Sequence, residues 1–117
     1  MNIEELKGEI LTHIDIGDDE VMLTTKSGRK IKIYHSQDCC ESVGIEGVEG
    51  DYHKLIGEIL VDVSEEIAGD NPPYEHCESW TWTTHKFRTT KDTVIVKWIG
   101  TSNGYYSETV SIKDITK

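Results

Sequence analysis

Apolar and polar residues alternate along most of this chain with a period of two, which is typical of β-strands that bury one face. Short clusters of Gly, Asp, Asn, Ser and Lys separate these stretches and indicate turns. The pattern predicts a mainly β protein with minor helix, in which about eight mostly antiparallel strands form a sheet or a barrel-like domain. The expected strands are residues 9–16, 20–25, 30–34, 41–48, 57–63, 79–90, 93–100 and 105–112.

Polar segments at residues 35–40, 65–78 and 101–104 interrupt this regular pattern. The longest of them contains Pro72-Pro73, which excludes regular structure at that point. Residues 3–7 are expected to form one helical turn that Gly8 ends, and residues 51–55 a second turn capped by Asp51. In the first strand, alternation is expected to place on one face Ile10, Thr12, Ile14 and Ile16.

A short motif occurs twice in the chain. Residues 6–11 read L-K-G-E-I-L and residues 55–60 read L-I-G-E-I-L, and residues 38–45 have a looser echo in residues 104–112, with one residue inserted. Because the motif consists of common residues, a chance match stays open. Taken as a duplication, it predicts one domain over residues 1–117, built from similar units at about 6–45 and 55–112 around a pseudo-twofold axis. The polar loops 35–41 and 101–107 then take equivalent positions.

Tryptophan and histidine positions can be assigned to faces in the same way. Trp80 and Trp82 are two residues apart in one strand and share a face, while Trp98 lies on the strand expected to pair with theirs. A cross-strand tryptophan cluster of this kind is expected in the core, and if exposed it would be a binding platform. Three histidines without a pattern of partners are expected at the surface, namely His13, His53 and His85.

Charge narrows the classes of partner. The 117 residues include 12 basic and 22 acidic side chains, for a net charge of −10. Such a charge repels phosphate backbones, so direct nucleic-acid binding is not expected. The acidic residues serve solubility or, alternatively, form a face that docks on a basic protein. No apolar run reaches a membrane-spanning length and the first residues do not resemble a signal peptide, so an intracellular protein with reduced cysteines is expected.

The loop at residues 35–41 holds several side-chain types that carry chemistry. One interpretation is a zinc site made by His35 with Cys39 or Cys40, joined by His76 and Cys77; the lack of a C-x-x-C or H-x-x-x-H spacing argues against it. Another is a cysteine nucleophile activated by His35, with Asp38 or Glu41 orienting the imidazole. The surrounding acids disfavour a thiolate. The third is a turn made by Asp38 beside a buried cysteine. No metal or cofactor is therefore predicted, and a non-catalytic role is favoured over an enzyme.

The second loop combines Asn103-Gly104, a strong turn signal, with two tyrosines and two serines. Aromatic side chains with polar tips suit a ligand pocket or a protein interface. The candidate binding residues are His35, Gln37, Asp38, Cys39, Cys40, Glu41, Trp82, Trp98, Ser102, Asn103, Tyr105 and Tyr106.

Residues 31–112 resemble a family of small bacteriophage and prophage proteins carried as a domain of unknown function. The resemblance rests on H-x-Q-D-C-C-E-x-V at residues 35–43, on Trp80-Thr81-Trp82, and on Trp98 followed by S-N-G-Y-Y-S at residues 102–107. It implies a phage or prophage setting, in the cytoplasm of the host cell, and no known activity.

Three functions follow as hypotheses. The favoured one is an accessory binding protein for a small ligand or a host protein, for example in an anti-defence role. The alternatives are a small cysteine–histidine enzyme or zinc-binding protein, and a structural or assembly protein. Self-association into a homo-oligomer is left open.

Overall fold

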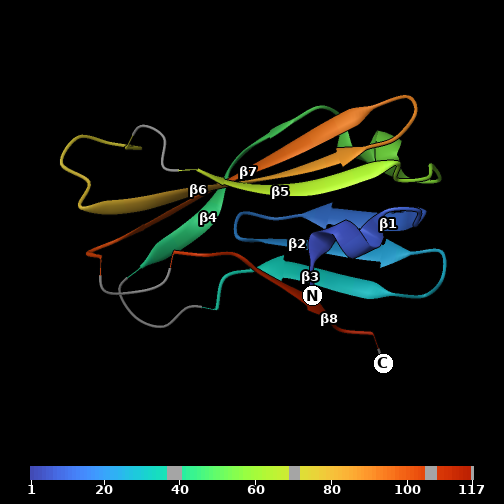
Figure 1. Ribbon diagram of the computed structural model, residues 1–117, viewed down its shortest axis with the longest axis horizontal. Helices are drawn as coiled ribbons and strands as arrows, with labels where there is room; N and C mark the ends of the chain where they lie inside the picture. The colour runs from blue at the N-terminus through green and yellow to red at the C-terminus, as the bar shows by residue number, and fades with distance from the viewer. Residues whose placement is uncertain (37–40, 69–71, 105–107, 117) are drawn as a thin grey trace.

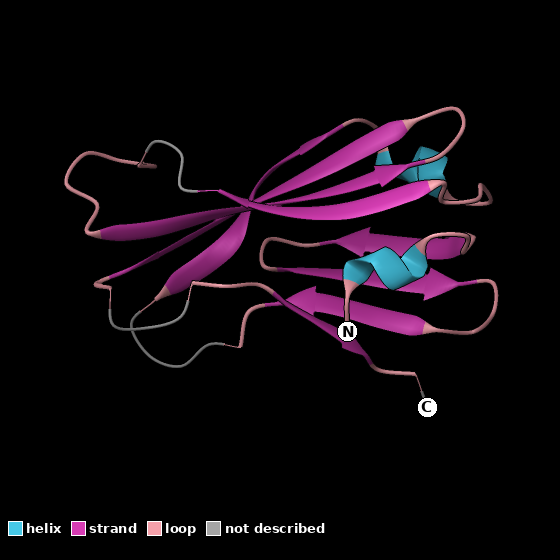
Figure 2. Cartoon of the chain, in the orientation of Figure 1, coloured by secondary structure: helices cyan, strands magenta, loops and turns pink. Residues whose placement is uncertain are grey.

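The chain folds into two antiparallel sheets that face one another (Figure 1). The computed structural model describes residues 1–36, 41–68, 72–104 and 108–116. Helical structure among these residues is restricted to two short 3₁₀ turns (Figure 2), and no helix among them is long and apolar enough to cross a membrane. The elements are η1 (Ile3–Leu6), β1 (Leu11–Ile16), β2 (Glu20–Thr25), β3 (Lys30–Tyr34), β4 (Ser42–Glu49), η2 (Tyr52–Leu55), β5 (Asp62–Ala68), β6 (Ser79–Arg88), β7 (Thr93–Ser102) and β8 (Ser111–Asp114).

The strand order shows how the two halves of the chain combine. Sheet A has the order β1-β2-β3-β8 and sheet B has the order β5-β6-β7-β4. Each half thus builds a three-stranded meander and gives its fourth strand to the meander of the other half. Moving every strand four places along the chain converts one sheet into the other, which confirms two similar units with pseudo-twofold topology. The two sheets stay open, so the barrel-like alternative is not the one adopted.

The repeated motifs pair with one another at the centre of the molecule. The backbone N–H of Gly8 donates to the carbonyl of Leu60 at 2.8 Å, and the N–H of Gly57 donates to the carbonyl of Leu11 at 2.9 Å. These bonds are equivalent under the exchange of the two halves. Both glycines have a positive φ, +87° for Gly8 and +84° for Gly57, a conformation that side chains with a Cβ rarely adopt. The glycine in each motif is therefore required for the exchange of hydrogen bonds.

The turns that precede the motifs are also equivalent. Asn2 caps η1 and Asp51 caps η2, and each side chain accepts a hydrogen bond from the backbone N–H two residues later. Each turn buries one leucine, Leu6 or Leu55, with 0% exposure. The predicted helical turn at residues 51–55 and its Asp51 cap are confirmed.

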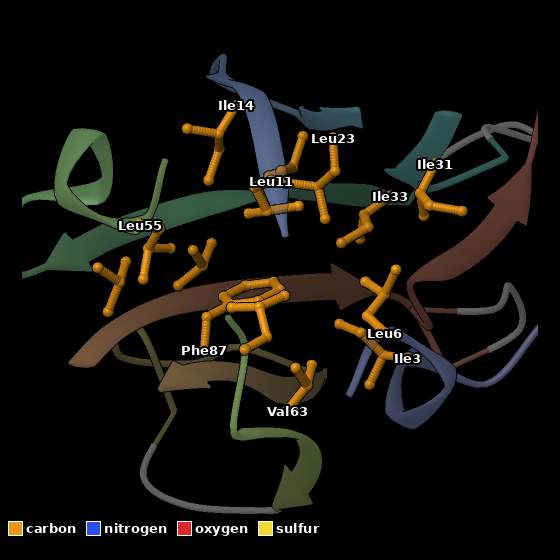
Figure 3. Packing of buried hydrophobic residues seen from close by; sticks show 14 of the residues in the cluster. Ile3, Leu6, Leu11, Ile14, Leu23, Ile31, Ile33, Leu55, Val63 and Phe87 are labelled. Carbon is orange, nitrogen blue, oxygen red and sulfur yellow. The ribbon is translucent and has the colours of Figure 1, made fainter. Parts of the chain in front are cut away.

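The core lies between the sheets and includes side chains from both halves (Figure 3). Phe87 from β6 lies among residues of both sheets in this view, and Trp98 from β7 is the largest side chain that is fully buried. The buried apolar residues are Ile3, Leu6, Leu11, Ile14, Val21, Leu23, Ile31, Ile33, Leu55, Leu60, Val63, Phe87, Val94, Val96 and Trp98.

Strict alternation is wrong for β1. The register between β1 and β2 shifts between Leu11 and His13, so a bulge changes which face the following residues occupy. As a result Leu11 and Ile14 are both buried, although a period of two would place them on opposite faces.

The strands expected from residues 57 and 105 begin well after those positions. β5 starts at Asp62, and the preceding Ile59 is 53% exposed, where it forms an isolated antiparallel bridge with Ile10. β8 starts at Ser111, and residues 108–110 are irregular. Before each of these strands begins, the chain contacts the other half: Ile59 forms a bridge with Ile10, and the carbonyl of Thr109 accepts a hydrogen bond from His35. The alternation of apolar residues does not indicate such contacts.

Leu6→Ala and Leu55→Ala are expected to lower the free energy of unfolding by similar amounts, about 2–5 kcal/mol each, because both leave a cavity in the shared core. Urea unfolding followed by tryptophan fluorescence measures this loss, and Lys54→Ala on the exposed side of η2 is the control. Each variant should show one transition, since neither half contains a complete sheet. Two separate transitions would contradict the strand exchange.

Candidate functional site

Two loops cross between the sheets at the same end of the molecule. Residues 35–41 connect β3 in sheet A to β4 in sheet B, and residues 103–110 connect β7 in sheet B to β8 in sheet A. Because β3 pairs with β8 and β4 pairs with β7, the ends of the two loops are neighbours (Figure 1). The central residues of both loops lie outside the described residues. They include the candidates Gln37, Asp38, Cys39, Cys40, Tyr105 and Tyr106.

His35 connects the two crossing loops. Its Nδ1 lies 2.7 Å from the backbone carbonyl oxygen of Thr109. A carbonyl can only accept, so Nδ1 carries the proton and donates. Nε2 then points toward Glu41, with 3.4 Å between Nε2 and Oε1. The side chains of His35 and Glu41 are 6% and 0% exposed, so this pair is buried at the corner where the chain enters β4.

Glu108 occupies the corresponding corner in the second half of the chain. It is 7% exposed, and its carboxylate accepts hydrogen bonds from the hydroxyls of Ser102 and Thr81, the latter at 2.9 Å. Burial raises the pKa of this carboxyl, but hydrogen bonds from Ser102, Ser79 and Thr81 favour the ionised form and leave the pKa below its ordinary value. Glu108 is thus a buried carboxylate held by neutral hydroxyl groups.

Gly100 makes room for this arrangement. A Cβ at Gly100 would lie 2.5 Å from the backbone oxygen of Glu108, which is closer than real contacts allow. The loop backbone therefore lies directly on β7, and only glycine at position 100 permits the carboxylate of Glu108 to reach Thr81 on β6 and Ser102 at the end of β7.

The two corners share one spacing between a buried glutamate and its partner. In each half the glutamate follows its partner by six positions: Glu41 follows His35, and Glu108 follows Ser102. Glu41 and Glu108 also coincide in the looser sequence echo. The difference is chemical, because the second half uses hydroxyl groups and the first half uses an imidazole that can be charged.

The three tryptophans do not form one cluster, which corrects the expectation from strand pairing. Trp82 pairs with Ile99 and Thr83 pairs with Trp98, so Trp82 and Trp98 point to opposite faces of sheet B. Trp98 is 0% exposed in the core, and its side chain is not available to a partner. Trp82 is partly exposed on the outer face, where the Nζ of Lys97 lies 4.5 Å from its ring centroid.

The remaining candidates lie close to these features. Ser102 directs its hydroxyl to Glu108 and also accepts a hydrogen bond from the N–H of Gly104 at 3.0 Å. Asn103 is exposed at the same turn. Glu108 and Thr81 were not among the predicted site residues. The echo of Glu41 was the signal that could have identified Glu108.

His85 is a second residue that sequence reasoning misplaced, because it was expected at the surface. It is 0% exposed, and its Nε2 lies 2.7 Å from the Oε2 of Glu65 on the paired strand β5. Burial lowers the pKa of His85, and the opposing effect of Glu65 does not cancel this. The alternation of Thr83, His85 and Phe87 along β6 would have placed it inside.

Other ionisable groups contribute less to the geometry. Within the described ranges, no three His, Cys, Asp or Glu side chains gather as a metal-binding group. His76 is exposed beside Glu75, with 3.5 Å between Nε2 and Oε1, and the Sγ of Cys77 donates to the carbonyl of Ser79 at 3.4 Å. Two hollows lie at the hairpin that joins β2 to β3, one of about 300 Å³ beside Gly28 and Lys30 and one of about 290 Å³ beside Lys26 and Ser27.

Residues 4–112 match a family described as Domain of unknown function (DUF7448), and because the match covers nearly the whole chain, the chain belongs to that family. Comparison with curated proteins gives no match. Comparison with solved structures gives no match either.

Glu108→Gln is expected to lower the free energy of unfolding by about 1–3 kcal/mol at neutral pH, because an amide cannot accept all the hydroxyl hydrogen bonds of the carboxylate. The pKa of Glu108 is lowered in the folded state. Its stabilisation is therefore complete above the ordinary glutamate range and is lost as the pH falls through the folded value. Urea unfolding between pH 2 and pH 7 measures both effects. The exposed Glu46→Gln variant should behave like wild type; equal curves for wild type and Glu108→Gln would contradict this assignment.

His85 should make the protein less stable as the pH falls below the ordinary histidine range. Its folded pKa is lowered, so the unfolded chain takes up a proton first, and stability decreases until the folded value is reached. The Cε1–H chemical shift of His85, followed by NMR against pH, reports the folded value directly. In His85→Gln the corresponding slope of stability against pH should disappear. A folded pKa at or above about 6.5 would contradict the burial argument.

Proposed function

We propose that this chain is an accessory protein of a bacteriophage or prophage that acts in the host cytoplasm by binding a host protein. The observation that carries the proposal is an aromatic surface on the outer side of sheet B, at the end where the loops cross. We call it the tryptophan face. Its residues are Trp80, Trp82, Lys97, Ile99 and Thr101.

Strand register places these residues side by side. Trp80 pairs with Thr101, Trp82 pairs with Ile99, and the inner face of the same strands is occupied by the core. An outer sheet face is ordinarily polar, since water covers it. Trp80 and Trp82, two residues apart on β6, instead leave apolar rings partly exposed on this face. Tryptophan is enriched among the hot-spot residues of protein interfaces. Lys97 lies over the Trp82 ring and restrains it.

The shape of this surface favours a protein over a small molecule. Small-molecule sites are concave and enclose most of the ligand. The tryptophan face is part of a regular sheet built from β6 and β7. A sheet face of this kind therefore suits a protein partner better than a small molecule.

Charge supports a basic partner. The net charge of −10 attracts positively charged proteins at long range and accelerates their encounter. Along the same outer side of sheet B, Glu66 and Lys86 follow the tryptophan face, and Glu49 and Arg88 lie at the opposite end of the strands. We therefore expect the apolar centre to provide affinity and the mixed charges around it to fix the orientation of the partner.

A photo-crosslinking amino acid at position 99, in protein produced in the host, tests this proposal. We expect one host protein to be crosslinked from position 99 and none from position 22, on the outer side of sheet A. The purified partner should bind Trp82→Ala at least about tenfold more weakly than wild type, the loss typical of an interface hot spot. Lys97→Ala should also weaken binding because it removes the cation over the Trp82 ring, and Lys32→Ala, whose Nζ lies 4.7 Å from the Tyr34 ring centroid on sheet A, is its matched control. Crosslinks to a second copy only would favour an assembly protein, and no crosslink would overturn the proposal.

A further inference from the structure

An apolar patch lies on the outer side of the second L-x-G-E-I-L motif. Of the six large apolar side chains that are exposed in the described part of the chain, three follow η2 directly, namely Ile56, Ile59 and Val61, each 41–53% exposed. Leu60 is buried between Ile59 and Val61, so alternation directs both of these outward. Ile10, which is partly exposed, forms an antiparallel bridge with Ile59 and adds its side chain to the same face. We call Ile10, Ile56, Ile59 and Val61 the motif patch.

The first motif shows that the fold does not require apolar side chains at all of these positions. Lys7 and Thr12 occupy the positions that correspond to Ile56 and Val61. Lys7 and Ile56 each end a 3₁₀ turn in the same way, since their backbone N–H groups donate to the carbonyl three residues earlier, at 3.1 and 3.3 Å. The same backbone is thus built with polar residues in one half and apolar residues in the other. A cluster of exposed apolar side chains that the fold does not need indicates a contact with another molecule.

The charged groups around the motif patch are nearly balanced. The patch is carried by residues 7–12 and 54–62, and the turn residues Lys26 and Lys91 are hydrogen-bonded to these segments. Four lysines and three acidic residues give this surface a net charge of +1, and they are Lys7, Lys26, Lys54, Lys91, Glu9, Glu58 and Asp62. The whole chain has a net charge of −10. Two copies of the chain therefore repel over most of their surfaces and least through this one.

This balance favours a second copy of the chain over a basic protein as the partner. A symmetric dimer brings one surface against itself, so that surface must be apolar at its centre and carry both signs of charge around it. Beside the patch, Lys7 and Asp62 form an ion pair at 3.5 Å, and Lys91 and Glu58 form another at 3.3 Å. These acids are matched by lysines of the same chain, which reduces their attraction for a basic protein.

A hollow adjoins the motif patch and provides space for side chains of a second copy. It measures about 290 Å³ and is lined by Gly8, Glu9, Ile10, Lys26 and Ser27, so Ile10 belongs both to the patch and to the hollow. Gly8 has no side chain to fill it, and no other atom of the described residues lies within 4 Å of the place that a Cβ would occupy there. We propose that the motif patch is the interface of a symmetric dimer of this chain, in which the exposed apolar side chains of each copy face the hollow of the other.

This dimer leaves the tryptophan face free, so the inference is independent of the proposed function. The backbone N–H of Val61 donates to the carbonyl of Arg88 at the end of β6, whereas Trp80 lies near its beginning. Eight residues of extended strand separate Trp80 from Arg88, a distance of about 26 Å. η2, which leads into the patch, likewise lies at the end of the molecule opposite the crossing loops (Figure 2). A dimer would therefore present two tryptophan faces.

Sedimentation equilibrium of the full-length protein tests this inference. Wild type should reach twice the mass of the chain as its concentration rises. Ile56→Lys combined with Val61→Thr gives the second motif the side chains that the first motif carries at these positions, so the fold should be kept, and the dimer should be weakened at least about tenfold. Ile67→Lys is the matched control, because it changes an apolar residue that is 59% exposed on β5 outside the patch, and it should keep the wild-type dimer.

Trp82→Ala should also keep the dimer, so that loss of the dimer and loss of host-protein binding can be told apart. A wild type that stays monomeric at every concentration would overturn the inference, as would equal dimer affinity in wild type and the double variant.

NMR of the wild-type protein gives a second readout that needs no folded variant. On dilution, the amide shifts that change should lie in residues 7–12 and 54–62, and changes confined to other segments would contradict the assigned interface. A photo-crosslinking amino acid at position 59, in protein produced in the host, should join two copies of the chain. Crosslinks from position 59 to a host protein alone would overturn the inference, because the patch would then serve a different partner.

Discussion

The reciprocal hydrogen bonds between the two L-x-G-E-I-L motifs are the constraint on which the rest of the structure depends. Gly8 donates to Leu60 and Gly57 donates to Leu11, so each motif completes the other. The same exchange is repeated on a larger scale by the strands, because β4 joins the meander of the second half and β8 joins that of the first. Neither half has a finished sheet without the other, and the apolar side chains of both meet in one core. The connection of the two crossing loops from one sheet to the other follows from this mutual completion.

Much of the fold could be predicted from the sequence because the signals were local. Alternation in β2, β3 and β7 reported a buried face directly, and the duplicated motif indicated two equivalent units. The failures occurred where contacts with the other half override alternation. The bulge between Leu11 and His13 changed the exposed face of β1, and Ile59 forms a bridge with Ile10 instead of belonging to a long strand. Such contacts depend on residues far apart in the sequence, which periodicity does not record.

The candidate site was predicted less well, for a related reason. His35, Glu41 and Ser102 were identified by residue type, but their partners Thr109, Thr81 and Glu108 are brought together only by the crossing of the chain between sheets. The tryptophans were assigned to neighbouring strands correctly, and a one-residue difference in register placed Trp82 and Trp98 on opposite faces. His85 was overlooked because a histidine was taken as a surface residue, although its neighbours along β6 alternate in and out. Residue chemistry can suggest a site, while register decides which residues share it.

The matched corners have a consequence for how this protein can change over time. A fold that contains a similar buried corner twice can keep one copy as a fixed support, as the hydrogen-bonded Ser102 and Glu108 do. The other copy is then less constrained, and substitutions at positions 35 and 41 can accumulate while the fold is kept. Duplication inside a single chain thus provides a second corner whose side chains can change without loss of the first. Variation among relatives should be tolerated more readily around His35 than around Gly100, where the close approach of the backbone leaves no freedom.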